Sequence, residues 1–315
     1  MSKENFVEII RYENRLKNDW DSFLDKAKNR TFLFKRDFIE YHNNKFDDFS
    51  LIFYINNQIQ ALLPANKVEN ILYSHQGLTY GGLILNDKIC ENGYFQLYDA
   101  LKLFLEQKNF SYFVLKQQLS FYNVEVSLWA NQYFDKIFKK EMNLTVDLLN
   151  LSISKSKLKH YRRSTKRNFE IKKETDLSSF WINVLQPLLW KKYKTKPVHN
   201  LKEIQYLKDK FPENIQQYSL YYDGIIIAGI TLFIADKVVK SQYGAATDLG
   251  KELRAMDYLF IYLLHFYKDL NYHYFDMGTV TNPNYENNIN SGLLQQKIEL
   301  GCEIYDQFTF NLVIT

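Results

Sequence analysis

Residues 216–245 read QQYSLYYDGIIIAGITLFIADKVVKSQYGA, and this stretch decides the fold. It contains three consecutive runs rich in β-branched and aromatic residues, at 216–222, 225–234 and 238–245. Asp223-Gly224 separates the first two runs, and this dipeptide is a strong hairpin signal because glycine adopts positive φ without strain. A short segment, 235–237, separates the second pair. The stretch therefore predicts three successive strands of a mainly antiparallel sheet.

The residues after this stretch continue with a helix, a strand, a helix and a strand. Apolar residues recur at helical spacing from 253 to 270, and a short strand is predicted at 273–277. After an Asn-rich loop, a helix is predicted at 291–300 and a last strand at 303–313. The predicted order of the second half is thus strand, strand, strand, helix, strand, helix, strand.

The first half predicts the same order of elements. Its strands are expected at 50–55, 58–65 and 71–75, followed by a helix at 94–107, a strand at 112–117, a helix at 123–133 and a strand at 135–148. The turns Asn56-Asn57 and Asp223-Gly224 lie 167 positions apart, and so do Ser74 and Ser241. One offset shared by two landmarks indicates an internal duplication.

Length and composition agree with two domains. A chain of 315 residues with 46% hydrophobic content can bury two ordinary cores, so we expect domains at 1–150 and 151–315. The 24 Tyr and 24 Phe favour sheets and ligand clefts alike. The sequence therefore predicts an α/β (α+β) protein with two similar domains, each with a mixed, mainly antiparallel sheet flanked by helices.

Several classes of protein are disfavoured by composition. Cys90 and Cys302 lack the spacing of a metal or redox site, so we expect two buried thiols and no metal. The first ten residues carry charges and no apolar stretch of signal-peptide length, and the longest apolar run, 225–235, is too short to span a bilayer. These features predict a cytoplasmic protein without a membrane span.

A basic segment lies between the two halves and contains a single acid, Glu170. Its cations are Lys155, Lys157, Lys159, Arg162, Arg163, Lys166, Arg167, Lys172 and Lys173. Two interpretations stay open, a solvated helix between domains and a contact with the phosphates of a ligand. Nucleic acid is the weaker hypothesis, because the net charge is only +4 and Tyr161 is the main aromatic residue interleaved with these cations.

The order of elements resembles that of the GNAT superfamily, and two such units joined by a basic helix resemble the FemAB-type tandem arrangement. The resemblance covers nearly the whole chain. The segments that carry it are LKHYRRSTKRN at 158–168, FDMG at 275–278, NSGLLQQK at 290–297 and SHQGLTYGG at 74–82. One segment departs from the pattern, because the acyl-CoA pyrophosphate loop expected at 247–255 contains one glycine and displaced cations.

The resemblance implies an acyltransferase with acyl-CoA as co-substrate. It is closest to enzymes that acylate the amino group of a dTDP-linked 3-amino-3,6-dideoxyhexose in surface-polysaccharide biosynthesis, with a donor such as 3-hydroxybutanoyl-CoA (the FdhC type). The expected partners are therefore acyl-CoA and a nucleotide sugar. Two alternatives remain: a FemAB-type transferase that moves an amino acid from aminoacyl-tRNA to a peptidoglycan precursor, and a non-catalytic module that binds acyl-CoA or a nucleotide sugar.

Three residues are candidates for catalysis. His75 lies at a predicted strand end beside a Gly-rich loop, and an unperturbed imidazole titrates near neutral pH, as a general base should. Asp276 ends the strand after the long helix, at an edge that often contacts ligands, although it could equally cap the next loop. Tyr243, on the third strand, is a candidate proton donor to the leaving thiolate or a core residue.

The other candidates are assigned to binding. Those expected to bind the cofactor lie in the second half and are Gln242, Gly244, Gly250, Arg254 and Asn290. Those expected to bind the acceptor are Thr79, Tyr80, Arg162, Arg163 and His199. The hydroxyls suit a sugar, and a planar guanidinium can bind phosphate through two hydrogen bonds. For each residue a packing or surface role is the alternative.

Overall fold

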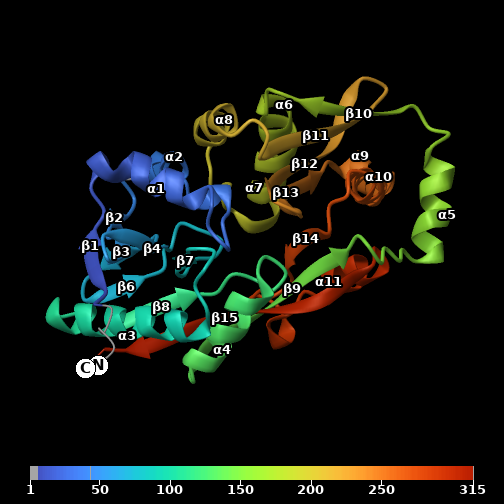
Figure 1. Cartoon of the computed structure of the whole chain (residues 1–315). Helices are drawn as coiled ribbons and strands as arrows, with labels where there is room; N and C mark the ends of the chain where they lie inside the picture. Colours follow the sequence, from blue (N-terminus) through green and yellow to red (C-terminus); the bar gives the residue numbers. More distant parts are fainter. Residues whose placement is uncertain (1–5, 43, 315) are drawn as a thin grey trace. The chain divides into compact units, whose positions relative to one another are not determined.

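The computed structural model describes residues 6–42 and 44–314, and of Glu286 it describes the backbone. The chain forms two compact units, Met1–Glu141 with Asp306–Thr315, and Met142–Tyr305. Both contain mainly antiparallel sheets flanked by helices (Figure 1), so the predicted fold class is confirmed. The last ten residues belong to the first unit, whereas the sequence had grouped them with the second half.

The second unit contains the three predicted strands as β11 (Ile215–Tyr222), β12 (Ile225–Ala235) and β13 (Val238–Ala246), which lie side by side in Figure 1. At the β11–β12 turn, Asp223 and Gly224 have φ values of 49° and 79°, the positive values that a two-residue hairpin turn requires. β10 (Phe169–Glu174) pairs with β11 on the outside. On the other side, β13 is parallel to β14 (Tyr274–Thr279), which pairs antiparallel with β9 (Ile137–Asp147).

Helices cover both faces of this sheet. α5 (Lys155–Ser164), α10 (Ala255–Asp269) and α11 (Ser291–Glu299) pack over one hydrophobic core, and the short α9 (Asp248–Glu252) precedes α10. α6 (Ser178–Phe180), a π-helical turn (Trp181–Leu185), α7 (Gln186–Tyr193) and α8 (Leu201–Lys210) form the other helical segment. Phe180 of this segment packs on Gly229 of β12, where a Cβ would come within 2.3 Å of its ring.

The first unit is built from the same order of elements. Its strands are β1 (Glu8–Arg11), β2 (Asp47–Asp48), β3 (Leu51–Ile55), β4 (Gln58–Leu63), β5 (Asn66–Val68), β6 (Ile71–Tyr73), β7 (Ile84–Leu85) and β8 (Tyr112–Lys116). Its helices are α1 (Lys17–Leu24), α2 (Arg36–Ile39), α3 (Glu91–Gln107) and α4 (Val124–Tyr133). β6 and β8 are parallel, as β13 and β14 are in the second unit. The repeated order predicted from the sequence is therefore present, and the first unit adds short strands such as β5 and β7 to it.

The final strand of each half pairs with the other half. β9 follows α4 of the first half and pairs with β14, whereas β15 (Cys302–Val313) follows α11 of the second half and pairs with β8. Such pairing between residues far apart in sequence cannot be read from local pattern. The exchange explains why the C-terminal residues belong to the first unit.

The prediction of two buried thiols was wrong for Cys90. Cys302 is buried, with its sulfur 3.2 Å from the sulfur of Met277. Cys90 is exposed, because it lies at the N-cap of α3 rather than inside a strand or helix. Within residues 6–42 and 44–314, no helix has the length and apolar character needed to cross a membrane.

Candidate functional site

The central feature of the second unit is a divergence of β13 from β14. The two strands pair only at Val238–Tyr274, Val239–Phe275 and Lys240–Asp276. Beyond Lys240, β13 continues to Ala246 without a β14 partner, and β14 turns at Gly278, whose φ is +78°. We call this divergence the strand opening. Along it, the backbone N–H and C=O groups of β13 that point toward β14 have no ladder partner there.

A buried charge cluster fixes the narrow end of the strand opening. The ammonium of Lys240 lies 2.8 Å from a carboxylate oxygen of Asp276, whose side chain is fully buried. The other oxygen of Asp276 accepts a 2.7 Å hydrogen bond from the Gly278 N–H. Lys297 of α11 donates to the carbonyls of Gly278 and Thr279, at 2.9 and 3.1 Å. These contacts hold the end of β14 in its turned course.

Lys240 and Lys297 were not among the residues predicted from the sequence. Burial lowers the pKa of Lys297 to about 8. Both residues stand beside predicted ones, since Lys240 precedes the third-strand candidates and Lys297 ends the NSGLLQQK segment. Their importance depends on the approach of α11 to β14, which no spacing in the sequence reveals.

A β-bulge shapes the edge of β13 along the strand opening. Thr231 pairs with Tyr243 and Leu232 with Ser241, so Gln242 is the extra residue. Bulges re-aim side chains and are frequent beside active sites. The Gln242 side-chain oxygen Oε1 is buried and has no hydrogen-bond partner among the described residues. A buried acceptor without a donor costs about 1–3 kcal/mol, so this atom marks a place where a ligand N–H or O–H would be stabilised.

Tyr243 and His199 form a hydrogen-bonded pair next to this bulge. The Tyr243 hydroxyl lies 2.5 Å from His199 Nδ1 and accepts a 3.3 Å hydrogen bond from the His199 backbone N–H. Trp181 donates its indole N–H to the His199 carbonyl and packs edge-on against the Tyr243 ring. Burial raises the pKa of Tyr243 to about 12. The sequence predicted Tyr243 and His199 in separate roles, and the structure brings them together.

The loop after β13 is shaped mainly by packing. The Gly250 N–H donates to the Thr247 hydroxyl, and a Cβ at Gly250 would come within 2.2 Å of the Ile227 carbonyl oxygen. Arg254 donates two hydrogen bonds to Asp257, at 3.0 and 2.7 Å. Asp257 also accepts from Lys157 of α5, at 2.7 Å, in a largely buried ion pair. Arg254 is therefore held in an ion-pair cluster, with part of its side chain still exposed.

Replacing Gly250 by Ala is expected to destabilise the second unit. The added methyl would meet backbone of β12, which cannot rotate away, and overpacking of this kind costs roughly 1 to 3 kcal/mol. Urea denaturation measures the loss. Gly292→Ala in the first turn of α11 is the matched control, because its Cβ would meet nothing closer than 3.8 Å, and it should leave stability unchanged or slightly raised. Equal stability of both variants would contradict this expectation.

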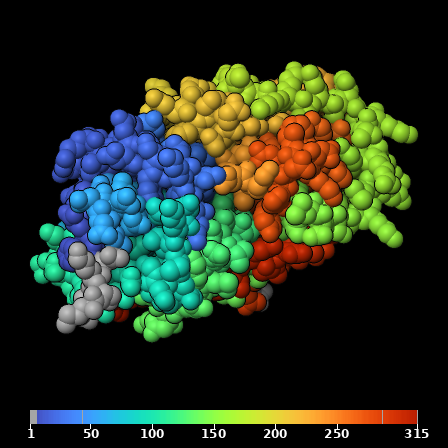
Figure 2. Space-filling model, viewed as in Figure 1, coloured from blue at the N-terminus to red at the C-terminus, as the bar shows by residue number. Residues whose placement is uncertain are grey.

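The remaining cofactor and phosphate candidates lie in different surroundings. Asn290 caps α11 by accepting a hydrogen bond from the Leu293 N–H, at 3.1 Å. Gly244 is exposed on β13 beyond the bulge. Arg162 and Arg163 are exposed on α5, which lies at the molecular surface in the yellow-green part of Figure 2, and neither forms an ion pair with another described residue.

His75, Thr79 and Tyr80 belong to the first unit, where the counterpart of the strand opening is closed. The ladder between β6 and β8 is extended by Ser74 and Gly81, which bond to the backbone of Val114 and Lys116. Gly81 lies so close to Ser74 that a Cβ would approach its carbonyl oxygen to 2.0 Å. Tyr80 is buried against other aromatic rings. Only the second unit, among the described residues, has parallel strands that stay apart.

His75 is buried with a left-handed φ of 69° and lies beside His42 and Phe46. Burial, followed by the nearby His42, lowers the pKa of His75 to about 3. An imidazole that binds a proton only near pH 3 is a weak general base at neutral pH. The sequence could not show this burial, because strand ends are usually exposed.

The neutral His75 is expected to make stability depend on pH. The folded state keeps it neutral down to about pH 3, whereas the unfolded chain protonates it near pH 6.5, so its contribution is fully present above pH 6.5 and is lost as pH falls. His75→Asn tolerates the left-handed φ and removes this proton uptake. Between pH 7 and pH 5 the variant should lose about 2 kcal/mol less unfolding free energy than wild type in urea titrations. Parallel losses in both proteins would contradict the assignment.

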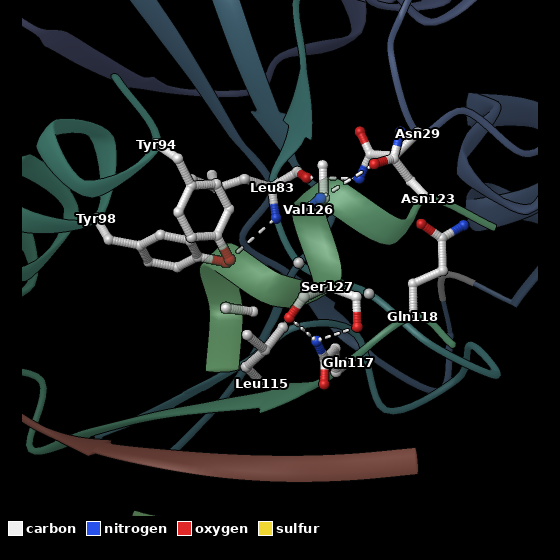
Figure 3. A pocket seen from close by; sticks show the side chains of 13 residues that line it. Asn29, Leu83, Tyr94, Tyr98, Leu115, Gln117, Gln118, Asn123, Val126 and Ser127 are labelled. Atoms are coloured by element: carbon white, nitrogen blue, oxygen red, sulfur yellow. Dashed lines mark hydrogen bonds between the residues drawn. The ribbon is translucent and has the colours of Figure 1, made fainter. Parts of the chain in front are cut away.

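Two hollows lie in the first unit. One is a small cavity of about 20 Å³, lined by Tyr98, Gln117 and Gln118 among others, where the Gln117 amide donates to Ser127 (Figure 3). It has room for a water molecule and not for a substrate. The other is an open hollow of about 600 Å³ over Arg36, whose guanidinium is buried and bonded to Glu40 and Asp48. No group of three or more His, Cys, Asp or Glu side chains in the described part of the chain is arranged to hold a metal ion.

Antiparallel strands, a long helix and a strand parallel to one of them follow one another in both units, and this repeated order defines a tandem GNAT-like fold. The sequence resemblance to GNAT and FemAB-like proteins is thus confirmed at the level of fold.

Solved structures match this fold over nearly the whole chain. The match with FemX covers 97% of this chain and 97% of the FemX chain, at a TM-score of 0.71 and 10% sequence identity. The match with L-PGS from Bacillus licheniformis covers 93% of this chain and 90% of the L-PGS chain, at a TM-score of 0.61 and 15% sequence identity. The match with a tandem GNAT protein from the clavulanic acid biosynthesis pathway covers 98% of this chain and 99% of that protein's chain, at a TM-score of 0.50 and 8% sequence identity. At such identities the similarity shows the fold alone.

Sequence comparisons add no relative. No protein-family model and no curated protein sequence matches the chain.

Proposed function

We propose that the protein is an N-acyltransferase that uses acyl-CoA and binds the thioester in the strand opening of the second unit. The observation that carries this proposal is the divergence of β13 from β14 beyond Lys240 and Asp276. A thioester there would receive hydrogen bonds from β13 N–H groups that have no ladder partner. Preorganised donors of this kind contribute about 3–4 kcal/mol each to transition-state stabilisation.

The Tyr243–His199 pair supplies the proton that the reaction needs. The amine nitrogen attacks the thioester carbon, the C–S bond breaks, and the departing thiolate takes the Tyr243 proton. A pKa of about 12 keeps this hydroxyl protonated at neutral pH. Amide formation releases one proton from the amine and thiol formation consumes one, so the pair returns to its starting state by taking up the amine proton through His199. The Gln242 side-chain oxygen, which has no hydrogen-bond partner among the described residues, would accept a hydrogen bond from an N–H of the bound substrates.

The predicted roles of His75 and Asp276 in proton removal stay predictions. Asp276 is fully buried and both of its oxygens already accept hydrogen bonds or an ion pair, which favours its action through the geometry of β14. His75 is held neutral by burial.

We propose that the acceptor is an amino sugar linked to a nucleoside diphosphate. The sequence resemblance implies a dTDP-linked 3-amino-3,6-dideoxyhexose. Thr79, Tyr80, Arg162 and Arg163 remain the acceptor-binding candidates, with Gly244, Gly250, Arg254 and Asn290 assigned to the cofactor. A second candidate function is aminoacyl transfer from aminoacyl-tRNA, favoured by the exposed cations of α5.

The test is a screen of the purified chain with a panel of acyl-CoA donors and nucleotide-linked amino sugars, read by mass spectrometry. Calorimetry with CoA, dTDP and tRNA accompanies it. Amide product together with CoA binding supports the proposal. Binding of tRNA without CoA would favour the second candidate, and failure of CoA and acyl-CoA to bind would overturn the proposed function.

A further inference from the structure

The end of α7 carries an exposed aromatic surface. Trp190 and Tyr193 are 58% and 42% exposed, and α7 contains no buried residue. Positions three apart on a helix are neighbours, so the two side chains project from the same face of α7. A helix that leaves large aromatic rings in solvent indicates a surface that something else covers.

Lysines accompany both rings. The Lys194 ammonium lies 5.9 Å from the centre of the Trp190 ring, and that of Lys192 lies 5.0 Å from the centre of the Tyr193 ring. We call these four residues the aromatic–lysine platform. Asp248, the carboxylate that pairs with Lys191 of α7, is also paired with Lys251, at 2.7 and 2.8 Å, and no ion pair of Lys192 or Lys194 occurs among the described residues. The platform therefore presents flat rings and unneutralised positive charge together.

Its contacts place the platform at the wide end of the strand opening. Asp248, which binds Lys191, lies in the segment that directly follows β13. Lys192 interacts electrostatically with Tyr285, in the loop that follows β14, and its hydrogen bond with Tyr193 raises its pKa. Because the carboxyl ends of β13 and β14 both lead to this place, a ligand that leaves the strand opening at this end meets the platform.

We propose that the aromatic–lysine platform binds the nucleotide end of CoA, with adenine stacked on the exposed rings and the phosphates contacted by the lysines. This inference rests on the proposed function, because it extends the same ligand beyond the strand opening. Aromatic rings provide stacking faces for bases, and lysine ammonium groups neutralise phosphate. A membrane surface fits less well, because the rings and lysines are confined to residues 190–194 and do not form the two long opposite faces of an interfacial helix.

The test compares CoA with pantetheine, which lacks the nucleotide, by calorimetry on the full chain. The double variant Trp190→Ala/Tyr193→Ala should bind CoA about 10-fold to 100-fold more weakly than wild type and pantetheine equally well. Lys192→Ala/Lys194→Ala should weaken CoA binding and reduce its salt dependence. All four side chains are exposed or partly so, and circular dichroism checks that the variants fold.

The matched control is Tyr206→Ala with Lys210→Ala on α8. Tyr206 is 44% exposed and has the Lys210 ammonium 5.9 Å from its ring. Its helix, α8, packs against β11, which β12 separates from β13 and the strand opening. This control should bind CoA as wild type does. Undiminished CoA binding by the platform variants would overturn the inference while leaving the proposed function intact. The inference would also be overturned if the platform variants lost binding of dTDP or tRNA while wild type did not bind CoA. If wild type turned over neither acyl-pantetheine nor acyl-CoA, the proposed function itself would be overturned.

Discussion

Replacing Tyr243 by Phe is expected to lower kcat for acyl transfer by about 100-fold to 10,000-fold, the usual contribution of a positioned general acid or base. The variant keeps the ring against Trp181 and loses only the hydroxyl that lies 2.5 Å from His199 Nδ1. Without this proton donor the thiolate must leave unprotonated. Steady-state kinetics with the acyl-CoA identified in the screen measure the loss.

A change of leaving group separates proton donation from a structural role. A thioester of an acidic aryl thiol leaves readily as the thiolate, so the variant should recover most of the wild-type rate with it. The matched control is Tyr221→Phe, because the pKa of Tyr221 is likewise raised to about 12 and its hydroxyl binds Glu174 away from the strand opening. An equal rate loss with both kinds of thioester would remove Tyr243 from the role of acid.

Removing one partner of the Lys240–Asp276 pair is expected to lower the unfolding free energy by about 3–5 kcal/mol, because the other charge stays buried without compensation. Asp276→Ala also leaves the Gly278 N–H without its acceptor. The double replacement Lys240→Met/Asp276→Leu should cost less than either single change, since an apolar pair of similar volume is often tolerated. Urea denaturation of Lys240→Met, Asp276→Leu and the double variant gives the coupling energy.

An exposed ion pair is the control for this experiment. Lys251→Ala breaks the surface contact with Asp248 and should leave the unfolding free energy nearly unchanged, because both side chains are exposed to solvent. If a single variant at Lys240 or Asp276 lost no more unfolding free energy than this control, the result would contradict a structural role for the buried pair. If the folded double variant retained CoA binding but not turnover, the pair would matter for the course of β14 rather than for stability alone.

Local pattern predicted most of the secondary structure. The Asp223-Gly224 turn, the helical spacing after 253 and the offset shared by the two halves correspond to elements that the structure contains. It did not predict the exchange of β9 and β15, because strand pairing depends on register between segments more than a hundred residues apart. Nor did it predict that Cys90 is exposed.

The candidate site was predicted in part. Gln242 and Tyr243 were chosen because they precede Gly244 on the third strand, and the bulge at Gln242 gives that position its distinct chemistry. The contact of Tyr243 with His199 spans 44 positions and arises because α6 to α8 fold back on the sheet. Thr79 and Tyr80 belong to the unit in which the ladder continues, a difference that Gly81 and its close approach to Ser74 create.

The sequence by itself determined the order of strands and helices, the duplication, and the strand on which the site is built, because these follow from periodicity and turn chemistry within short windows. The tertiary structure decided which of the two similar halves keeps its parallel strands apart and which side chains are buried beside them. Those outcomes depend on contacts such as Lys297 with Gly278 and Ser74 with Gly81, which form only when distant segments pack together.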